Sequence, residues 1–398
     1  MASLASAVND AGQVVGTMTS GSYFGDAGRF VWTPASGLTA LAQGSMQAAS
    51  ASDINSSGLI VGVGYVIVPR FGLLRRSTVF WRWSWDDELV NLGPSYGLWM
   101  LGDRGTSWRW VHPMPPGAMG RGDLDGNGQD DLVLEFGPGV GVWVWMNHGT
   151  WFQLTSMSAN AILVANLDGI GQKEAVLSIP GYGLWTWALN GSPQWRQLNP
   201  NSVSRMAICQ GESGADNLAA AFPGQGLWLT GGVYSWTQIH DREPSLLLCA
   251  KAQPAPSPVH APLSQVVAGF PGAGLWAYGA VATFVGPYPS ISYVWKHIHP
   301  FDVQHVAAGD LDGKGTDDLV IDFGPQYGLW VHHNDATWTP LHGFSAQDVG
   351  TADLDGIGGD EVIVNFGPPH GLWAYSRVAG WRVLHDYRIY GILTGVLH

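Results

Sequence analysis

Four short loops rich in Asp and Gly carry the side chains of this chain that could bind a metal ion. In the first loop, residues 123–131 (DLDGNGQDD), an oxygen donor falls at every second position. The donors are the side chains of Asp123, Asp125, Asn127 and Asp131 and the backbone carbonyl of Gln129. Ca²⁺ binds about six to eight such oxygens, and the intervening glycines allow the backbone to wrap tightly. The spacing predicts a structural Ca²⁺ site.

Three further loops carry the same pattern in a degraded form. Their donors at positions one, three and nine are Asn166, Asp168 and Glu174, then Asp310, Asp312 and Asp318, and finally Asp353, Asp355 and Glu361. Position five is Ile170, Lys314 or Ile357, and the Lys314 ammonium could replace the ion. Each of the four loops is either a Ca²⁺ site, which is the favoured alternative for 123–131, or an Asp/Gly turn whose side chains accept hydrogen bonds from backbone N–H groups. Both alternatives are structural roles.

A Pro/Gly turn followed by Gly-Leu-Trp, or once by Gly-Val-Trp, recurs seven times. Its tryptophans are Trp99, Trp143, Trp185, Trp228, Trp276, Trp330 and Trp373. Successive members are mostly 42 to 44 residues apart, a period typical of a four-stranded propeller blade. The longer spacings around Trp276 coincide with insertions at 251–262 and 280–292.

Aromatic and imidazole side chains occupy fixed places in this repeat. The pattern W-x-x-[LVI]-H ends in His112, His240, His299, His342 and His385, and the turns contain Tyr96, Tyr182, Tyr327 and His370. Because antiparallel strands alternate in direction, both sets belong on the face of the fold opposite the acidic loops. With Trp185, Trp330 and Trp373 they predict ligand sites between neighbouring blades. The alternatives are a strand-end hydrogen bond for each His and packing between blades for most Trp.

The elements that must position these side chains are short strands. In one complete unit they are expected at 304–309, 319–323, 328–332 and 338–341, and no segment has helical periodicity. A lone four-stranded sheet exposes both faces, so the units must stack around an axis. We expect an all-β fold, a single propeller of four-stranded antiparallel blades, with eight blades favoured over seven.

Residues 1–92 carry a different repeat. AVNDAGQVVG at 7–16 returns as DINSSGLIVG at 53–62, and each copy is followed by an apolar strand containing Trp. This pattern resembles the HAF repeats of bacterial extracellular proteins. The resemblance implies an extracellular or cell-surface protein of bacterial origin, and we expect the two copies to form two blades.

The acidic loops resemble the calcium loops of FG-GAP repeats, also called VCBS or integrin-α-type repeats. Phe136-Gly137 and Phe323-Gly324 stand where that family has its Phe-Gly pair, and the likeness covers roughly 99–385. It implies a propeller with structural Ca²⁺. We expect one domain over 1–398, with HAF-like blades in 1–92, acidic-loop blades in 93–387 and a closing strand in 388–398.

Composition and charge limit the classes of partner that the protein can bind. The chain has 398 residues and a net charge of −13, which excludes the basic surface of a nucleic-acid-binding protein. No apolar run reaches the ~18 residues of a membrane span, and the first residues do not form a signal peptide. Cys209 and Cys249 lie about one repeat apart, and two buried free thiols are favoured over a disulfide.

Catalytic motifs are missing from the sequence. No HExxH, GxSxG, P-loop or CxxC pattern occurs. Residues 102–108 contain D-x-G-x-x-W, which resembles the Asp-box of sialidases, but Leu101 stands in place of its Ser. Quinoprotein dehydrogenases are also Trp-rich propellers with Ca²⁺, but they have adjacent cysteines near the cofactor, whereas Cys209 and Cys249 are far apart in this sequence. We therefore expect a protein that is not an enzyme.

The content of 21 Trp exceeds what blade packing requires, and Trp faces stack on the C–H faces of sugars. In plan the chain is similar to bacterial and fungal propeller lectins, which implies multivalent binding of glycans or glycoconjugates between blades. The alternatives are a protein-binding adhesion module of the integrin-α type and a structural spacer within a larger surface protein. An exposed apolar or charged patch on one face would favour the protein-binding alternative.

Overall fold

The structure, a computed structural model, describes residues 89–393 with gaps at 103–105, 190–192, 212–213, 232–234, 253–263, 286–287, 335, 356–358 and 387–390. Before residue 89, and in strand residues 282–285, 288–291 and 391–393, it describes the strand backbone alone. The chain divides into two compact units, Met1–Trp85 and Asp86–His398.

The first unit contains two antiparallel sheets. One has four strands in sequence order, β1 (Ala2–Val8), β2 (Val14–Thr19), β3 (Ala27–Thr33) and β4 (Gly37–Ala40). The other has three, β5 (Gln47–Ile54), β6 (Leu59–Ile67) and β7 (Leu74–Arg82). Each HAF-like copy therefore spans the first antiparallel pair of one sheet.

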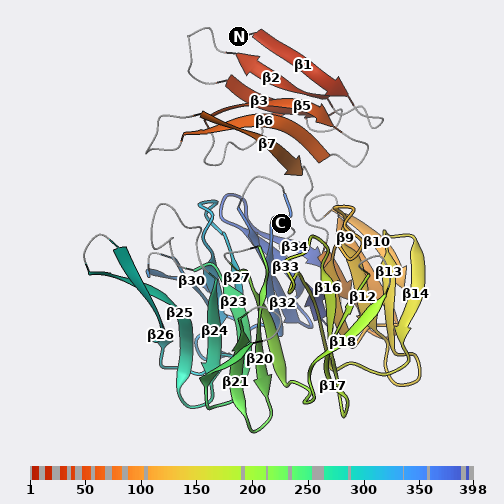
Figure 1. Cartoon of the computed structure of the whole chain (residues 1–398), viewed down its shortest axis with the longest axis vertical. Coiled ribbons are helices and arrows are strands. Elements are labelled where there is room, and N and C mark those ends of the chain that lie inside the picture. The colour runs from red at the N-terminus through yellow and green to blue at the C-terminus, as the bar shows by residue number, and fades with distance from the viewer. Residues whose placement is uncertain are drawn as a thin grey trace. The chain divides into compact units, whose positions relative to one another are not determined.

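The second unit contains seven four-stranded antiparallel sheets, which we number as blades 1 to 7 (Figure 1). Blade 1 consists of β35 (Gly391–Leu393), β8 (Glu88–Asn91), β9 (Leu98–Gly102) and β10 (Ser107–His112). Blade 2 has β11 (Ala118–Gly122), β12 (Asp131–Glu135), β13 (Val142–Met146) and β14 (Thr150–Thr155). Blade 3 has β15 (Ala161–Ala165), β16 (Glu174–Ile179), β17 (Gly183–Ala188) and β18 (Gln194–Asn199).

Blades 4 to 7 follow the same plan, each running from an inner to an outer strand. Blade 4 has β19 (Arg205–Cys209), β20 (Asn217–Phe222), β21 (Gly226–Thr230) and β22 (Trp236–His240); blade 5 has β23 (Leu246–Ala250), β24 (Gln265–Phe270), β25 (Gly274–Val285) and β26 (Tyr288–His299). Blade 6 has β27 (His305–Gly309), β28 (Asp318–Asp322), β29 (Leu329–His332) and β30 (Trp338–His342); blade 7 has β31 (Asp348–Ala352), β32 (Glu361–Gly367), β33 (Gly371–Ser376) and β34 (Gly380–His385).

The ring closes through the C-terminal tail. Strand β35 pairs antiparallel with β8, and Ile392 faces Val90 in the register. It thereby takes the innermost place of blade 1, next to β31 of blade 7. The favoured count of eight blades is not confirmed, because the tail rather than an HAF-like sheet completes the hairpin that carries Trp99. Both HAF-like sheets lie in the first compact unit.

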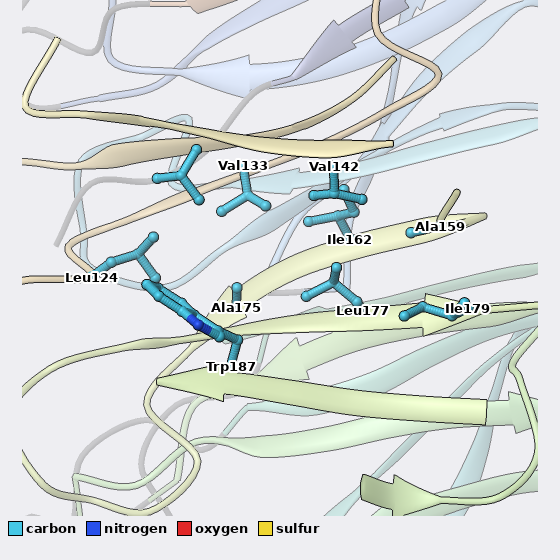
Figure 2. Close-up of a cluster of buried hydrophobic side chains, with 10 residues drawn as sticks. Leu124, Val133, Val142, Ala159, Ile162, Ala175, Leu177, Ile179 and Trp187 are labelled. Carbon is cyan, nitrogen blue, oxygen red and sulfur yellow. The ribbon is translucent and has the colours of Figure 1, made fainter. Parts of the chain in front are cut away.

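The core of the ring lies between blades. In Figure 2, Leu124, Val133 and Val142 of blade 2 pack against side chains of blade 3. All the residues of β12 and β16 are buried, and blade 7 packs against blade 1 in the same way. Each sheet thus buries both faces against its neighbours, which is the physical reason for the closed ring.

The cysteines differ from the expectation of free thiols. Cys209 at the end of β19 and Cys249 in β23 form a disulfide, with their Cα atoms 5.1 Å apart. The inner strands of neighbouring blades run side by side at the axis, so equivalent positions one repeat apart come within bonding reach.

Among the described residues, no helix is long and apolar enough to cross a membrane.

Candidate binding site at the blade junctions

The Gly-Leu-Trp turns are built in the same way in all seven blades. Each turn tryptophan donates its indole Nε1–H to the carbonyl oxygen three residues earlier, at 2.7 to 3.0 Å. The preceding glycine has a positive φ, +70° at Gly328, where an added Cβ would collide with the carbonyl oxygen of His342. The turn therefore lies directly against the end of the outer strand of its own blade. We call this end of the ring the turn face.

The strand-terminal histidines cap the chain where it leaves the outer strand. The Nδ1 atoms of His112, His240, His299 and His342 each accept a hydrogen bond from the backbone N–H two residues later, at 2.9 to 3.3 Å. Thr155 and Asn199 accept the same bond through side-chain oxygens at 3.1 and 2.9 Å. The strand-end alternative thus describes these residues.

Burial favours the neutral imidazole at four of the strand-terminal histidines. It lowers the pKa of His240, His299, His342 and His385. A neutral ring can accept at Nδ1 and carries its proton on Nε2.

Each histidine also crosses to the next blade. The rings of His112, His240, His299 and His342 lie 4.1 to 4.7 Å, centroid to centroid, from Phe136, Phe270, Phe323 and Phe366. The same histidines lie 5.3 to 5.4 Å from the outer-strand tryptophan of that blade. His385 contacts Trp108 of blade 1 at 5.1 Å. The sequence prediction placed aromatic and imidazole groups between neighbouring blades, and the geometry brings them together there.

Two blade junctions contain open cavities at equivalent places. The cavity between blades 2 and 3 has a volume of about 230 Å³ and is lined by Leu154, Thr155, Met157, Ile179, Tyr182, Trp185 and Trp195. The cavity between blades 5 and 6 has about 210 Å³ and is lined by His299, Phe301, Phe323, Tyr327, Trp330 and Trp338. Turn tyrosine, turn tryptophan and outer-strand tryptophan are common to both.

The remaining predicted ligand residues lie at other junctions. Tyr96 lies in the turn of blade 1, where its carbonyl oxygen accepts the Trp99 N–H. His370 and Trp373 lie in the turn of blade 7, and His370 contacts Phe344 across the junction of blades 6 and 7. His112, His240 and His385 serve the junctions described above. The predicted residues that line a described cavity are Tyr182 and Trp185 in one, and His299, Tyr327 and Trp330 in the other.

Sequence reasoning missed the residue two places after the strand end. This position holds Met157 and Phe301 in the two cavities, and Phe344 between blades 6 and 7, where it lies 5.1 Å from His370. Phe301 and Phe344 are 44% and 52% exposed, and Tyr182 and Tyr327 are 59% and 46% exposed. The recurring His-x-Phe motif was the sequence signal that could have identified Phe301 and Phe344. The turn face therefore exposes an apolar, aromatic set.

The 123–131 loop gathers three carboxylates on the opposite face. The Asp123 carboxylate accepts the N–H groups of Gly126 and Gly128 at 2.7 Å. Buried Asp131 accepts the N–H groups of Leu124 at 2.9 Å and Asn147 at 2.7 Å. Oxygens of Asp123, Asp125 and Asp131 all lie within 4.8 Å of one another. Burial, with the neighbouring charges of Asp125 and Asp123, raises the pKa of Asp131 to about 6.

Asn127 and Gln129 are placed differently from a simple ligand set. The Asn127 Oδ1 accepts the Gln129 N–H at 2.6 Å, and its amide Nδ2 donates to Asp125 at 3.2 Å. The loop is thus an Asp/Gly turn and a candidate cation site at once. Its side chains hold the turn by hydrogen bonds, and three of its carboxylates still lie close together.

The loop at 353–361 gathers a similar set. Oxygens of Asp353, Asp355 and Glu361 lie within 4.8 Å of one another. Glu361 is buried and accepts the Leu354 N–H at 2.8 Å. Burial, together with the charge of Asp355, raises the pKa of Glu361 to about 7. These residues fit a divalent cation.

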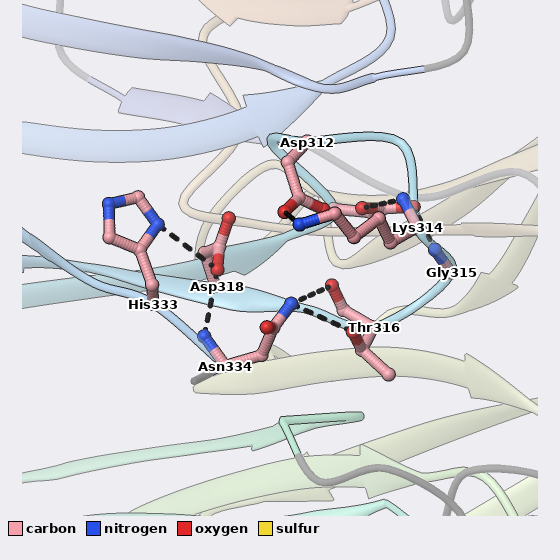
Figure 3. Close-up of polar contacts among 8 residues, drawn as sticks. Asp312, Lys314, Gly315, Thr316, Asp318, His333 and Asn334 are labelled. Atoms are coloured by element: carbon pink, nitrogen blue, oxygen red, sulfur yellow. Dashed lines mark hydrogen bonds and ion pairs between the residues drawn. The ribbon is translucent and has the colours of Figure 1, made fainter. Parts of the chain in front are cut away.

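The loop at 310–318 supplies its own cation (Figure 3). Lys314 Nζ lies 2.6 Å from Asp312 Oδ2, and the Asp310 carboxylate accepts the Lys314 N–H at 2.9 Å. Asp318 is fully buried, accepts the Asn334 N–H at 3.0 Å and lies 3.4 Å from His333 Nδ1. Burial would raise the pKa of Asp312, but the hydrogen bond and charge of Lys314 outweigh burial and lower it.

The loop at 166–174 has two carboxylates and is held by turn hydrogen bonds. Asp168 accepts the Ile170 N–H and Glu174 accepts the Leu167 N–H, both at 2.8 Å. Burial, followed by the effect of Asp168, raises the pKa of Glu174 to about 7. Asn166 donates its backbone N–H to Asp216 of blade 4 at 2.9 Å.

Comparison with known proteins finds similarity to solved structures only. No family model matches the sequence, and no curated protein matches it. BBS1N in complex with ARL6DN, solved after soaking with mercury, is similar at 13% identity with a TM-score of 0.48, covering 70% of this chain and 83% of that one. The lead-soaked crystal of the same complex gives 12% identity, a TM-score of 0.49, and coverage of 75% and 94%. Sqt1 from Chaetomium thermophilum gives 10% identity, a TM-score of 0.34, and coverage of 98% and 87%.

Proposed function

We propose that this propeller is a non-catalytic binding module that holds a protein partner on its turn face. The partner would insert side chains into the aromatic pockets at the blade junctions. The supporting observation is the repeated exposed set of Tyr, Phe, Met and Trp on one face, which matches the residues enriched at the centres of protein interfaces. Several weak sites on one rigid ring reinforce one another.

The chemistry of the pocket walls supports a side chain as the ligand. In the pocket between blades 5 and 6, His299 Nδ1 already accepts a backbone N–H and Trp330 Nε1 already donates to Tyr327 O. The remaining polar atoms of the lining are His299 Nε2, the Tyr327 hydroxyl and Trp338 Nε1. A sugar ring needs several hydrogen-bond partners to replace its lost water, because each unpaired polar group costs about 1–3 kcal/mol.

A peptide display selection tests this proposal. Peptides selected on the wild-type protein should contain side chains that insert into the pockets and should lose binding to Tyr182→Ala and Tyr327→Ala. Both tyrosines are exposed, and their backbone carbonyls still accept the tryptophan N–H, so the fold should persist. Selected peptides that bind both variants as well as wild type would contradict the proposal.

Glycan binding is the second candidate. The observation that favours it is the presence of two tryptophans and a tyrosine in each cavity, since such faces can stack on sugar rings. A glycan array, probed with and without Ca²⁺, distinguishes the candidates. Hits that free sugar abolishes and that need Tyr182 or Tyr327 would favour a lectin.

We also propose that Ca²⁺ binds the loops at 123–131 and 353–361 in a structural role. The support is the convergence of three carboxylates in each loop. Because an ion bound to the folded state alone stabilises it, saturation at 100 times Kd should add roughly 2–3 kcal/mol. Thermal unfolding that is unchanged by EGTA would contradict this proposal.

An extracellular or cell-surface location remains our proposal. The disulfide between Cys209 and Cys249 supports it, because disulfides persist in oxidising compartments. Thiol labelling of the denatured protein, purified from its own cells under alkylating conditions, should find no free cysteine. Two labelled cysteines would contradict an oxidising location.

A further inference from the structure

At the junction of blades 4 and 5, an arginine side chain of the protein itself, Arg242, occupies the aromatic site. Arg242 there holds the position that Phe301 holds between blades 5 and 6. Its guanidinium carbon lies 5.9 Å from the centre of the Phe270 ring, and Nη2 donates to Pro271 O at 2.6 Å. His240 stacks on the same ring at 4.1 Å. A cation of the chain itself thus lies over the ring that corresponds to Phe323 in the cavity.

The junction of blades 5 and 6 has the same floor and more aromatic walls. Every residue that lines its cavity is a Phe, Tyr, Trp or His, and Phe301 lies 5.0 Å from Tyr327. The faces of such rings carry partial negative charge and attract guanidinium and alkylammonium groups. A cavity of about 210 Å³ has room for the end of one side chain.

The surrounding charge favours a cation as well. The chain carries a net charge of −13, and Phe301 of the pocket wall is followed in the chain by Asp302, whose carboxylate accepts the Gly272 N–H at 2.8 Å. Burial also holds His299 in its neutral form by lowering its pKa, so the pocket wall adds no positive charge. These charges complement a basic partner.

We propose that the pocket between blades 5 and 6 receives the guanidinium of an arginine side chain from a basic protein partner. This inference rests on the proposed function, and it adds the chemical class of the inserted side chain. The pocket between blades 2 and 3 has Met157 and Ile179 in the places of Phe301 and Phe323. Thr155 also stands in the place of His299. This pocket therefore lacks three of the rings and takes neutral and cationic side chains alike.

The test uses the indole N–H groups as reporters of single junctions. Nuclear magnetic resonance of the ¹⁵N-labelled protein follows the signals of Trp330, Trp276 and Trp185, each assigned by substitution to Phe. The probes are N-acetyl-argininamide and N-acetyl-citrullinamide, which have side chains of similar size but differ in charge. The arginine probe should bind at Trp330 with a Kd about three- to fivefold lower than the citrulline probe, whereas both should bind equally at Trp185.

Two variants sharpen the result. Phe301→Leu should remove the preference at Trp330, and Tyr182→Leu should leave it intact. Arg242→Phe combined with Ala273→Tyr gives blade junction 4–5 the residue set of the cavity, so the arginine probe should then shift Trp276, which stays unaffected in wild type. Failure of Trp276 to respond in that variant would overturn the equivalence on which the inference rests.

The outcomes separate the two proposals. Equal affinity of both probes at Trp330 overturns the cation site and leaves binding at the junctions standing. If neither probe shifts Trp185 or Trp330, insertion of side chains into the pockets is wrong, and so is the inference. A response to methyl pyranosides alone overturns both in favour of the glycan candidate.

Discussion

At the scale of single residues, the repeat keeps a bond geometry and varies the side chain that makes it. His, Thr and Asn all accept the same backbone N–H at the end of the outer strand, because each carries an acceptor close to Cβ. The histidines add stacking against the next blade. Their recurrence is thus explained by strand capping, and the variable neighbours two residues later give each junction its own chemistry.

Replacement of His342 should separate capping from stacking. His342→Ala loses both contributions, each worth about 0.5–1.5 kcal/mol. His342→Asn keeps an acceptor, as in the natural Asn199, and should lose roughly half as much. Urea unfolding followed by tryptophan fluorescence measures both variants, and equal losses would show that the hydrogen bond contributes nothing.

Lys314 offers a second test at this scale. Lys314→Asn changes the loop to the spelling of 123–131 at position five and removes the ammonium that lies against Asp312. We expect the variant to bind one additional Ca²⁺, measured by native mass spectrometry or calorimetry. Lys314→Arg keeps a cation and serves as the control, with unchanged stoichiometry. An unchanged count in the Asn variant would contradict the assignment of Lys314 as the resident cation.

At the scale of elements, two kinds of connection build a blade. The Gly-Leu-Trp turn is fixed by backbone geometry, and the acidic loop is fixed by carboxylates that accept N–H groups. The first survives in all seven blades because its glycine is sterically required. The acidic loop tolerates loss of its ligand residues, because a metal ion, the Lys314 ammonium or hydrogen bonds can each stabilise it.

The turn glycine can be tested against a matched loop glycine. Gly328 and Gly315 have φ values of +70° and +82°, but only at Gly328 would a Cβ strike a backbone oxygen. Gly315→Ala should cost about 1 kcal/mol for the left-handed backbone alone. Gly328→Ala should cost at least about 2 kcal/mol more, as the turn must move away from His342. Chemical denaturation compares them, and similar losses would contradict the steric argument.

The acidic loops make stability depend on pH in a defined direction. Burial raises the pKa of Glu174 to about 7 in the folded chain, from an ordinary value of 4.5. A raised pKa means that the folded state binds the proton more tightly, so this stabilisation is complete below pH 4.5 and is lost as pH rises through about 7. Glu174→Gln should therefore reduce the fall in the free energy of unfolding between about pH 5 and 8.

The size of this effect is on the order of 1–3 kcal/mol at about pH 8. The measurement is urea unfolding in EGTA at several pH values, because Ca²⁺ would favour the charged form of nearby carboxylates. In Glu174→Gln the side-chain amide oxygen can still accept the Leu167 N–H, so the loss of stability in acid should be small. A variant whose pH profile parallels that of wild type would contradict the assignment.

At the scale of the whole second unit, each blade packs against its two neighbours, and the pairing of β35 with β8 joins the last blade to the first. Strand β35 contributes three residues to blade 1, yet it connects the two ends of the unit. Chain truncation after Asp386 should remove this strand, expose the buried Leu89 and Val90, and lower stability by several kcal/mol. Truncation after Leu393 is the control and should have little effect. Equal melting temperatures for the two truncations would contradict the closing role.

Sequence periodicity predicted much of this architecture. Alternating apolar residues, the Trp spacing and the Gly-Pro turns were sufficient for an all-β fold of four-stranded antiparallel blades, since these are local signals. The blade count was less accessible, because it depends on which distant strand pairs with β8. The disulfide was also missed, because the proximity of Cys209 and Cys249 arises only when β19 and β23 stack at the axis.

The same division holds for the candidate sites. The sequence by itself determined which residue types recur and on which end of a strand they fall, because register and turn length are set within one repeat. Only the tertiary structure decided that Asp353, Asp355 and Glu361 converge whereas Lys314 neutralises its own loop. It also decided that Phe301 and Tyr327 from different blades share one cavity. Contacts between blades depend on how neighbouring repeats pack, and no single repeat encodes them.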